Sequence, residues 1–443
     1  MKTYKRYWNE SMETLTRENY IAVQEKALRN QLSYVWENSL FYKRKFMQAG
    51  VNPDKVKSLE DLELLPFTTK SELRDSQIAS PPLGEHITCD KRQVKRIYST
   101  SGTTGRPTFI GLTAKDVDTW SETACRAFWT CGLRSDSIVP LVVAPFLVAF
   151  SFADAIQKIG TVVPIGVGST DRLIGAFQHI GANALLATSS FPLHFSASLT
   201  KRGIDPKSLG IRLIMAGGEP GAAIPSVRAE VEDTFGCRFL EMMGNGDLYG
   251  EMFAECENKN GMHFIAQGIV HPEIIDPESG KSLEISEGTR GELVLTSLER
   301  QCIPLVRFRT HDHVQVVSTR CGCGRTGFSI RVFGRTDEMI IVQGVNVYPS
   351  AVRDVVASFA PDTTGAMEIQ LNSPPPEGWQ PPIHIKVELR CHVADPDALK
   401  HRIESRIREK LIFRSAIEPV PEGSLPRFEY KAKLVRKLYE EHN

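Results

Sequence analysis

The sequence predicts an α/β protein with a large N-terminal domain and a small C-terminal α+β domain. The chain has 443 residues, enough for two or three domains with ample apolar cores. Between residues 108 and 220, apolar strand-like segments alternate with helical segments that end at glycine, which is typical of mostly parallel sheets. From about residue 262 the segments become β-rich, and the last hundred residues resemble a small α/β unit.

Helices joined by loops are expected over residues 1 to about 75, and a short strand over 108–113. A helix is expected from residue 114 to about Cys131. Three helix starts carry a capping signature, in which a hydroxyl residue is followed three positions later by an acid. These signatures are Ser58-x-x-Asp61, Thr69-x-x-Glu72 and Thr113-x-x-Asp116.

The alternating region supplies the strands and helices of the large domain. Strands are expected at 137–146, 161–167, 182–189 and 211–220, and helices at 152–160 and 170–181. The last strand ends in a glycine turn that contains Gly217 and Gly218.

The β-rich region is expected to form a subdomain of the large domain. Its strand-like segments are 263–277, 291–298 and 303–317. After residue 334, helices are expected at 349–359 and 395–412, and a strand at 382–391. We therefore predict an N-terminal domain over residues 1–334 and a C-terminal domain over 335–443, with the boundary between Gly334 and Asp337.

Composition narrows the class of protein. Lys plus Arg equal Asp plus Glu at 53 each, so no net field favours nucleic acid or an anionic membrane as a partner. No apolar run occurs in the first fifty residues, and we expect neither a signal peptide nor a membrane anchor. Nine cysteines, scattered except for one cluster, indicate reduced thiols and a cytoplasmic protein.

A segment rich in hydroxyl side chains, "YSTSGTTGRPT", runs from Tyr98 to Thr108. Glycine lets backbone N–H groups approach an anion and hydroxyls add donors, so the segment fits a phosphate cradle, although an ordinary surface loop has the same composition. A P-loop is excluded, because Gly102 and Gly105 are three residues apart and are followed by Arg106 and strand-like residues.

The hydroxyl segment resembles the phosphate-binding loop of the adenylate-forming superfamily. Seven segments occur in the order expected of phenylacetate–coenzyme A ligases. They are "FYKRKFMQAGV", "SLEDLELLPFTTKSELRD", "STSGTTGRPT", "GGEP", "VRFRTHD", "FGRTDEMIIVQGVNVYPS" and "LPRFEYKAK". The resemblance implies a mobile C-terminal domain, a homodimer, and the joining of an acid to ATP as acyl-adenylate before transfer to the thiol of CoA.

The resemblance also implies roles for individual residues. The β- and γ-phosphates of ATP would be held by Ser99, Thr100, Ser101, Gly102, Thr103, Thr104 and Gly105. The adenine side would be lined by Gly217, Gly218, Glu219, Pro220, Met243 and Gly244, and Asp312 would accept the ribose hydroxyls. Without the family, Asp312 is a loop acid between His311 and His313, and its residue type favours a solvated acid over a functional one.

The C-terminal residues follow the same resemblance. Arg335 and Asp337 would form the hinge between the domains, where the alternative is an ordinary surface turn. Lys431 would contact the α-phosphate during adenylation, with Lys433 and Lys437 as the alternatives. The segment that faces the pantetheine arm of CoA would include Gly344, Val345 and Tyr348.

One motif departs from the family pattern. The usual Tyr-Gly-x-Ser/Thr-Glu appears here as Met243-Gly244-Asn245-Gly246-Asp247, so the expected magnesium ligand is Asp247, one methylene shorter than glutamate. Tyr430 also stands where glycine usually precedes the catalytic lysine. These changes motivate one alternative, a nucleotide-binding pseudoenzyme.

Four residues offer soft and borderline ligands with spacing suited to a metal. They are Cys256, His263, Cys321 and Cys323. A closed set of this kind is typical of structural zinc, and some members of the family carry zinc at the equivalent place. The alternative is a group of buried free cysteines.

The substrate is expected to be an aromatic carboxylate of the phenylacetate, benzoate or aminobenzoate type. Phe146, Phe150 and Phe152 are possible walls of an apolar slot, with Gly244 at its carboxylate end, although phenylalanines in such a segment are often plain core. A further alternative is an enzyme that adenylates the acid and loads a carrier-protein thiol in place of CoA.

Overall fold

The computed structural model describes residues 4–100, 108–219, 221–335, 338–342, 345–374, 380–426 and 434–440. The chain divides into two compact units. The larger unit comprises Met1–Ala187, Lys207–Gly217 and Leu240–Arg331, and the smaller unit comprises Thr188–Pro206, Gly218–Phe239 and Val332–Asn443. A domain boundary at residue 334 stays a prediction.

The larger unit begins with helices, as predicted. They are α1 (Glu10–Glu13), α2 (Arg17–Asn38), α3 (Leu40–Gln48), the 3₁₀ helices η1 (Pro53–Lys55) and η2 (Glu60–Leu64), α4 (Lys70–Ala79) and η3 (Lys91–Gln93). The Thr69–Glu72 capping box forms with both of its hydrogen bonds. The signature at Ser58 forms only in part: Asp61 accepts the backbone N–H of Ser58, but the 3₁₀ helix that follows has no side-chain cap.

Strands β1 (Arg96–Ser99) and β2 (Phe109–Leu112) pair antiparallel on either side of the hydroxyl segment. Helix α5 (Ala114–Cys131) follows with the predicted capping box of Thr113 and Asp116. It ends at Gly132, which has a left-handed conformation with φ of 102°.

The parallel pairs expected in the alternating region are present. Strand β3 (Ile138–Leu141) pairs with β4 (Thr161–Pro164), and β5 (Ala184–Ala187) pairs with β6 (Leu213–Ala216). The helical segments of this region are η4 (Val148–Ser151), α6 (Phe152–Ile159), α7 (Thr170–Ile180) and η5 (Pro206–Leu209). The helices that follow strand β3 therefore form the crossover to its parallel neighbour β4.

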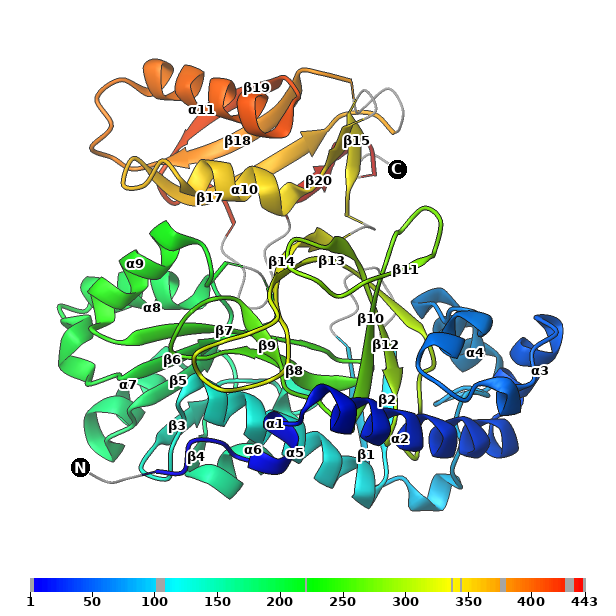
Figure 1. Cartoon of the computed structure of the whole chain (residues 1–443). Coiled ribbons are helices and arrows are strands. Elements are labelled where there is room, and N and C mark those ends of the chain that lie inside the picture. The colour runs from blue at the N-terminus through cyan, green and yellow to red at the C-terminus, as the bar shows by residue number, and fades with distance from the viewer. Residues whose placement is uncertain are drawn as a thin grey trace. The chain divides into compact units, whose positions relative to one another are not determined.

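A ten-stranded sheet runs through the larger unit in the order β11-β10-β12-β13-β14-β9-β8-β7-β6-β5, and α5 packs against β8 (Figure 1). The new strands are β7 (Arg238–Asn245), β8 (Tyr249–Glu255), β9 (Met262–Phe264), β10 (Val270–Ile275), β11 (Ser282–Leu283), β12 (Arg290–Ser297), β13 (Phe308–Ser318) and β14 (Ser329–Arg335). The pairs β7–β8, β8–β9, β10–β12 and β12–β13 are antiparallel, so the β-rich region adds antiparallel strands to the parallel pair β5–β6.

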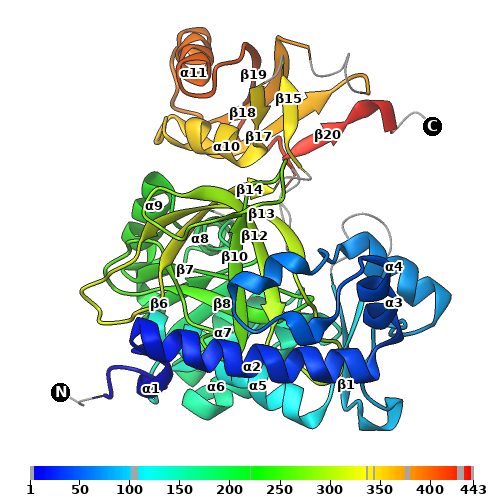
Figure 2. The same cartoon turned by 45° about the vertical axis from the view of Figure 1, so that its right-hand side comes forward.

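The smaller unit contains a four-stranded sheet in the order β19-β18-β17-β20 and a separate hairpin, β15–β16. Its elements are α8 (Phe191–Lys201), α9 (Pro225–Phe235), β15 (Ile340–Val342), β16 (Val345–Val347), α10 (Pro349–Ala357), β17 (Thr363–Leu371), β18 (Ile383–Leu389), α11 (Pro396–Leu411), β19 (Ser415–Pro421), β20 (Val435–Lys437) and η7 (Leu438–Glu440). Helices α10 and α11 contact each other and pack on β17 and β19 (Figure 2). This confirms the predicted α+β character of the C-terminal part.

The apolar cores follow the predicted segments. In the larger unit, Phe128 of α5, Ile156 of α6 and Met215 of β6 belong to one buried cluster. In the smaller unit, Val352 of α10 and Ile403 of α11 share a cluster with the sheet. Among the described residues, no helix has the length and hydropathy that a membrane span needs.

Candidate active site

The base of the hydroxyl segment is closed by hydrogen bonds between its two ends. The Thr100 backbone N–H donates to the Thr108 carbonyl at 3.1 Å, and the hydroxyl oxygens of these threonines lie 3.0 Å apart. The Ser99 N–H donates to the Phe146 carbonyl at 2.9 Å. These bonds fix where the segment leaves and re-enters the fold. The predicted phosphate-binding residues between them (Ser101, Gly102, Thr103, Thr104 and Gly105) lie outside the described residues.

Asp247 lies directly beside this base. It follows β7 and is 5% exposed. Its Oδ1 accepts the Thr108 hydroxyl at 2.9 Å, and its backbone N–H donates to the Asn245 side chain at 3.0 Å. The structure therefore brings the predicted metal-binding acid to the base of the predicted phosphate loop.

Lys70 completes this arrangement. Its Nζ lies 2.7 Å from Oδ2 of Asp247, so both carboxylate oxygens of Asp247 have a donor. Lys70 is the first residue of α4, directly after the Thr69 cap. The capping box predicts where α4 begins, but nothing in the sequence indicated that this lysine reaches Asp247.

His86 is buried near the same carboxylate. Burial lowers the pKa of its imidazole to about 4, although the charge of Asp247 acts in the opposite direction. Its Nδ1 lies 3.0 Å from the Ser76 hydroxyl. His86 is therefore neutral at physiological pH, and Lys70 is the cation that contacts Asp247.

Glycines give the β7–β8 hairpin its tight shape. A Cβ atom at Gly244 would lie 1.3 Å from the Gly250 carbonyl oxygen, so no other residue fits there without moving the backbone. A Cβ at Gly246 would lie 3.1 Å from Val148. Met243, expected at the adenine side, precedes Gly244 and pairs with Phe253 in the ladder. The hairpin thus holds Asp247 in a closely packed turn.

The predicted adenine segment begins where β6 ends. The Gly217 N–H donates to the Ala187 carbonyl at 3.0 Å, which extends the β5–β6 ladder by one residue. Gly218 follows with a left-handed φ of 83°. In the smaller unit, the Glu219 carboxylate accepts the backbone N–H and the hydroxyl of Ser190 at 2.8 and 2.6 Å. Pro220 lies outside the described residues.

Glu251 on β8 is a buried acid that the sequence analysis missed. It is 4% exposed, and its Oε2 has no hydrogen-bond partner among the described residues. Desolvation by burial raises the pKa of Glu251 well above its usual value. Because "YGEMF" looks like an ordinary strand, no local pattern marks this residue.

The remaining predicted nucleotide and hinge residues occupy separate elements. Asp312 is half-buried on β13, where its N–H donates to the Thr310 hydroxyl at 3.0 Å. Arg335 ends β14, and its Nε lies 3.8 Å from a carboxylate oxygen of Glu338. Tyr348 is half-buried before α10, and Val345 begins β16. Asp337, Gly344 and Lys431 lie outside the described residues.

The three predicted pocket phenylalanines have different surroundings. Phe152 is buried in the core, where its ring meets that of Phe128 edge to face at 5.5 Å. Phe146 is 56% exposed, with its ring 6.2 Å from that of Phe109. Phe150 lines a cavity of about 450 Å³ together with Tyr98. Phe152 thus belongs to the buried apolar cluster, and the role of the three phenylalanines as pocket walls stays a prediction.

The four predicted metal ligands lie together. Ligand atoms of Cys256, His263, Cys321 and Cys323 are all within 4.8 Å of one another. Sγ of Cys256 lies 3.8 Å from that of Cys321, and Sγ of Cys323 lies 3.5 Å from Nε2 of His263. The other ring nitrogen, Nδ1, lies 3.1 Å from the Gly327 carbonyl, which directs Nε2 toward the thiols.

The start of the chain supports the loop that carries Cys321 and Cys323. Arg6 donates to the Gly322 carbonyl at 2.9 Å, and the Tyr7 hydroxyl donates to the Cys323 carbonyl at 3.1 Å. A Cβ atom at Gly324 would lie 2.3 Å from the Tyr7 hydroxyl oxygen, so this close approach requires glycine. A buried ion pair between Glu13 and Arg325, 2.8 Å long, completes the support.

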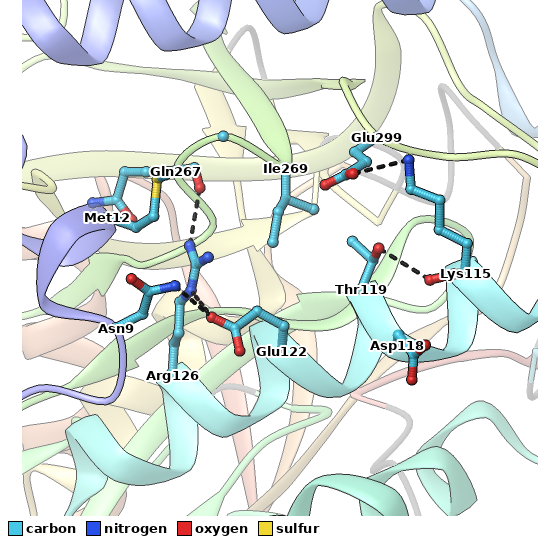
Figure 3. Close-up of a pocket in the computed structure, with 11 residues that line it drawn as sticks. Asn9, Met12, Lys115, Asp118, Thr119, Glu122, Arg126, Gln267, Ile269 and Glu299 are labelled. Atoms are coloured by element: carbon cyan, nitrogen blue, oxygen red, sulfur yellow. Dashed lines mark hydrogen bonds and ion pairs between the residues drawn. The ribbon is translucent and has the colours of Figure 1, made fainter.

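A second cavity of about 450 Å³ lies beside α5 and the loop before β10 (Figure 3). Arg126 donates to Glu122 and to the Gln267 carbonyl, each at 2.9 Å. Lys115 pairs with Glu299 at 2.9 Å. In the described part of the chain, none of the predicted site residues lines this cavity, and these charged groups pair with one another.

Comparison with known proteins identifies similar chains. Residues 344–438 match the AMP-binding enzyme C-terminal domain. The phenylacetate–coenzyme A ligase of Thermus thermophilus is 31% identical, covering 94% of this chain and 96% of that protein. The phenylacetate–coenzyme A ligase of Escherichia coli is 30% identical, covering 95% of each chain. The crystal structure of 2-hydroxyisobutyryl-CoA ligase with 2-HIB-AMP superposes with a TM-score of 0.90 at 26% identity, covering 100% of this chain and 95% of that one.

Proposed function

Because this chain belongs to the phenylacetate–coenzyme A ligase family of AMP-forming acid–CoA ligases, we propose that its substrate is an aromatic carboxylate. The acid would be of the phenylacetate, benzoate or aminobenzoate type, and the enzyme would act in the cytoplasm as a homodimer. The similar crystal structure is that of a ligase named for 2-hydroxyisobutyrate, which is an aliphatic acid. The same fold therefore binds a small non-aromatic acid in that protein.

The reaction has two steps that place different demands on the protein. First, a carboxylate oxygen attacks the α-phosphorus of ATP, the bond to the β-phosphate oxygen breaks, and pyrophosphate leaves. Next, the sulfur of CoA attacks the acyl carbon, the thiol proton is lost, and AMP leaves. The first step brings several negative charges together, so catalysis depends on positioning and charge stabilisation.

The hydrogen-bonded series Thr108–Asp247–Lys70 is the observation that carries this proposal. It places a carboxylate and a cation at the base of the segment that would hold the β- and γ-phosphates. Magnesium keeps several waters and needs only one or two protein carboxylates beside phosphate oxygens, so the donor set fits this ion. Asp247 would hold it, Lys70 would fix the carboxylate, and the ion would supply charge neutralisation.

The other roles follow the family resemblance. The β- and γ-phosphates of ATP would be bound by the segment Ser99–Gly105. The adenine would be bound by Gly217–Pro220 together with Met243 and Gly244, and the ribose by Asp312. Lys431 would contact the α-phosphate, Arg335 and Asp337 would serve the hinge, and Gly344, Val345 and Tyr348 would bind CoA.

We also propose that the four-residue cluster holds a structural zinc ion. A tetrahedral zinc with bonds of about 2.3 Å to sulfur and about 2.0 Å to nitrogen separates two sulfurs by about 3.8 Å, and a sulfur and a nitrogen by about 3.5 Å. Two ligand pairs have distances of 3.8 and 3.5 Å. Since all four positions are protein ligands, the ion would stabilise the loop and take no part in the reaction.

A screen of aromatic acids with ATP, magnesium and CoA tests the proposed reaction when AMP and thioester are followed together. Equal amounts of both products support the ligase. AMP without thioester favours loading of a carrier-protein thiol. Nucleotide binding without either product favours a pseudoenzyme, the alternative that the Met243 and Asp247 substitutions motivate.

A further inference from the structure

Two cysteines outside the proposed zinc site lie side by side. Cys89 belongs to the segment between α4 and β1, and Cys302 to the segment between β12 and β13. Their side chains form a hydrogen bond with each other. More than two hundred residues separate the two positions, so no local pattern in the sequence marks them as a pair. The fold thus brings together two thiols that are far apart along the chain.

Main-chain hydrogen bonds hold the two segments against each other. The Thr88 N–H donates to the Cys302 carbonyl at 2.9 Å, and the Thr88 hydroxyl donates to the Gln301 carbonyl at 2.6 Å. The Tyr34 hydroxyl oxygen lies 3.0 Å from the Thr88 carbonyl oxygen and 2.9 Å from that of Gln301. Asp116, in the first turn of α5, accepts the Cys302 N–H at 2.9 Å. Because both segments are fixed and the thiols already touch, a bond between the two sulfurs needs little movement of the main chain.

The two thiols differ in exposure and in acidity. Cys89 is half-buried, whereas Cys302 is fully buried. The hydrogen bond from Cys302 lowers the pKa of the Cys89 thiol, and the same contact together with burial raises the pKa of Cys302. Since the thiolate is the reactive form, Cys89 is the thiol with which an oxidant reacts first. Cys302 is then the neighbouring thiol that can attack the oxidised sulfur.

We propose that Cys89 and Cys302 form a reversible disulfide when the protein is exposed to a peroxide. The Cys89 thiolate attacks one oxygen of hydrogen peroxide, the O–O bond breaks, and hydroxide leaves with a sulfenic acid on Cys89. The sulfur of Cys302 then attacks the Cys89 sulfur, the S–O bond breaks, and the departing hydroxyl takes the Cys302 thiol proton to become water. The two thiols together lose two electrons, which the peroxide gains. Two water molecules result once the first hydroxide takes up the proton that Cys89 lost.

The disulfide joins two segments that border the candidate active site. The segment of Cys89 also carries His86, which is buried near the Asp247 carboxylate. Sγ of Cys302 packs against β2, where a Cβ atom at Gly111 would lie 2.7 Å from it. A cross-link between positions so far apart restricts the unfolded chain much more than the folded one, so the oxidised protein should unfold at a higher temperature. In reducing compartments, reversible disulfides are typical of redox sensing.

The test uses the full chain, purified with a reducing agent, freed of it and then treated with hydrogen peroxide. Remaining thiols are alkylated, and tryptic peptides are mapped by mass spectrometry. We expect the peptide of residues 75–91 to be linked to that of residues 301–307, and dithiothreitol to separate them. After the same treatment, the thermal unfolding midpoint of the parent should exceed that of Cys89→Ser by at least about 2 °C. No substrate is needed, so the result does not depend on the proposed ligase function.

Cys125→Ser is the matched control for the buried partner, because Cys125 is also fully buried but donates its thiol to the Ala155 carbonyl. It should form the linked peptide as the parent does. Cys302→Ser should not, and its Cys89 should instead be oxidised further to sulfinic acid. The inference is overturned if the treated parent contains Cys89 and Cys302 only in separate peptides. Should Cys302→Ser fail to fold, Cys89→Ser decides: its Cys302 should stay reduced, and oxidation of Cys302 there would contradict the proposal.

Discussion

The Lys70 ammonium lies 2.7 Å from the Asp247 carboxylate and so joins the first residue of α4 to the turn that follows β7. Asp247 also accepts the Thr108 hydroxyl, which places this ion pair at the base of the hydroxyl segment. The side chain of Asp247 is 6% exposed and that of Lys70 is 28% exposed. Solvent therefore screens the pair less than it screens a surface ion pair, and each partner constrains the other.

Changing Asp247 to asparagine should slow adenylation by at least tenfold, about 1.4 kcal/mol of transition-state stabilisation. The amide keeps the shape but loses the charge that would hold magnesium. Pyrophosphate release measured over a magnesium titration should show a higher magnesium requirement, and Asp247→Glu should keep more activity. An Asp247→Asn enzyme with the parent rate and magnesium dependence would show that Asp247 is not a metal ligand.

Lys70→Met should raise the magnesium concentration needed for half-maximal adenylation, because Asp247 loses the group that fixes its carboxylate. Lys70→Arg keeps a cation and should lie closer to the parent. The control is Lys115→Met, which breaks the ion pair with Glu299 at the cavity beside α5. If Lys70→Met lowers the unfolding midpoint but leaves the magnesium dependence unchanged, Lys70 serves stability alone.

Protein purified without added metal should contain about one equivalent of zinc, as measured by elemental analysis. Cys321→Ser or Cys323→Ser should remove most of it and lower the thermal unfolding midpoint, since a structural site contributes directly to folding. The substrate preference of the folded fraction should not change. Cys391→Ser is the control, because that cysteine is exposed and outside the cluster. Metal-free parent protein of full stability would rule out the zinc site.

His86 should make the free energy of unfolding fall as the pH drops into the mildly acidic range. Its pKa is lowered to about 4 by burial, whereas the unfolded chain has the usual value near 6.5, so the unfolded state binds a proton first as the pH falls. The contribution of His86 to the free energy of unfolding is therefore fully present above pH 6.5 and is lost as the pH falls toward 4. Between pH 7 and pH 5 the free energy of unfolding should drop by roughly 2 kcal/mol from this residue. Urea unfolding of His86→Gln should lack this part of the pH dependence, while His401→Gln, at an exposed site, should match the parent.

The parts of this structure that the sequence predicted are those that depend on local patterns. The capping boxes at Thr69 and Thr113 involve residues three positions apart, and both formed. That Cys256, His263, Cys321 and Cys323 come together was predicted from ligand type and spacing, while the zinc ion itself stays a prediction. Lys70 was missed because its partner is 177 residues away and a lysine near a helix start is common. Glu251 was missed because only the packing around β8 reveals that its carboxyl has an oxygen without a partner.

The ion pair between Glu13 and Arg325 has a consequence for how the chain is made. The two residues are 312 positions apart. At a synthesis rate of about 5–20 residues per second, the ribosome adds Arg325 roughly 15 to 60 s after Glu13. During that interval Glu13 lacks the cation that its buried carboxylate contacts, so α1 cannot complete its docking. This contact between α1 and the rest of the larger unit can therefore form only after the segment that carries the Cys321–Cys323 loop and Arg325 has been made.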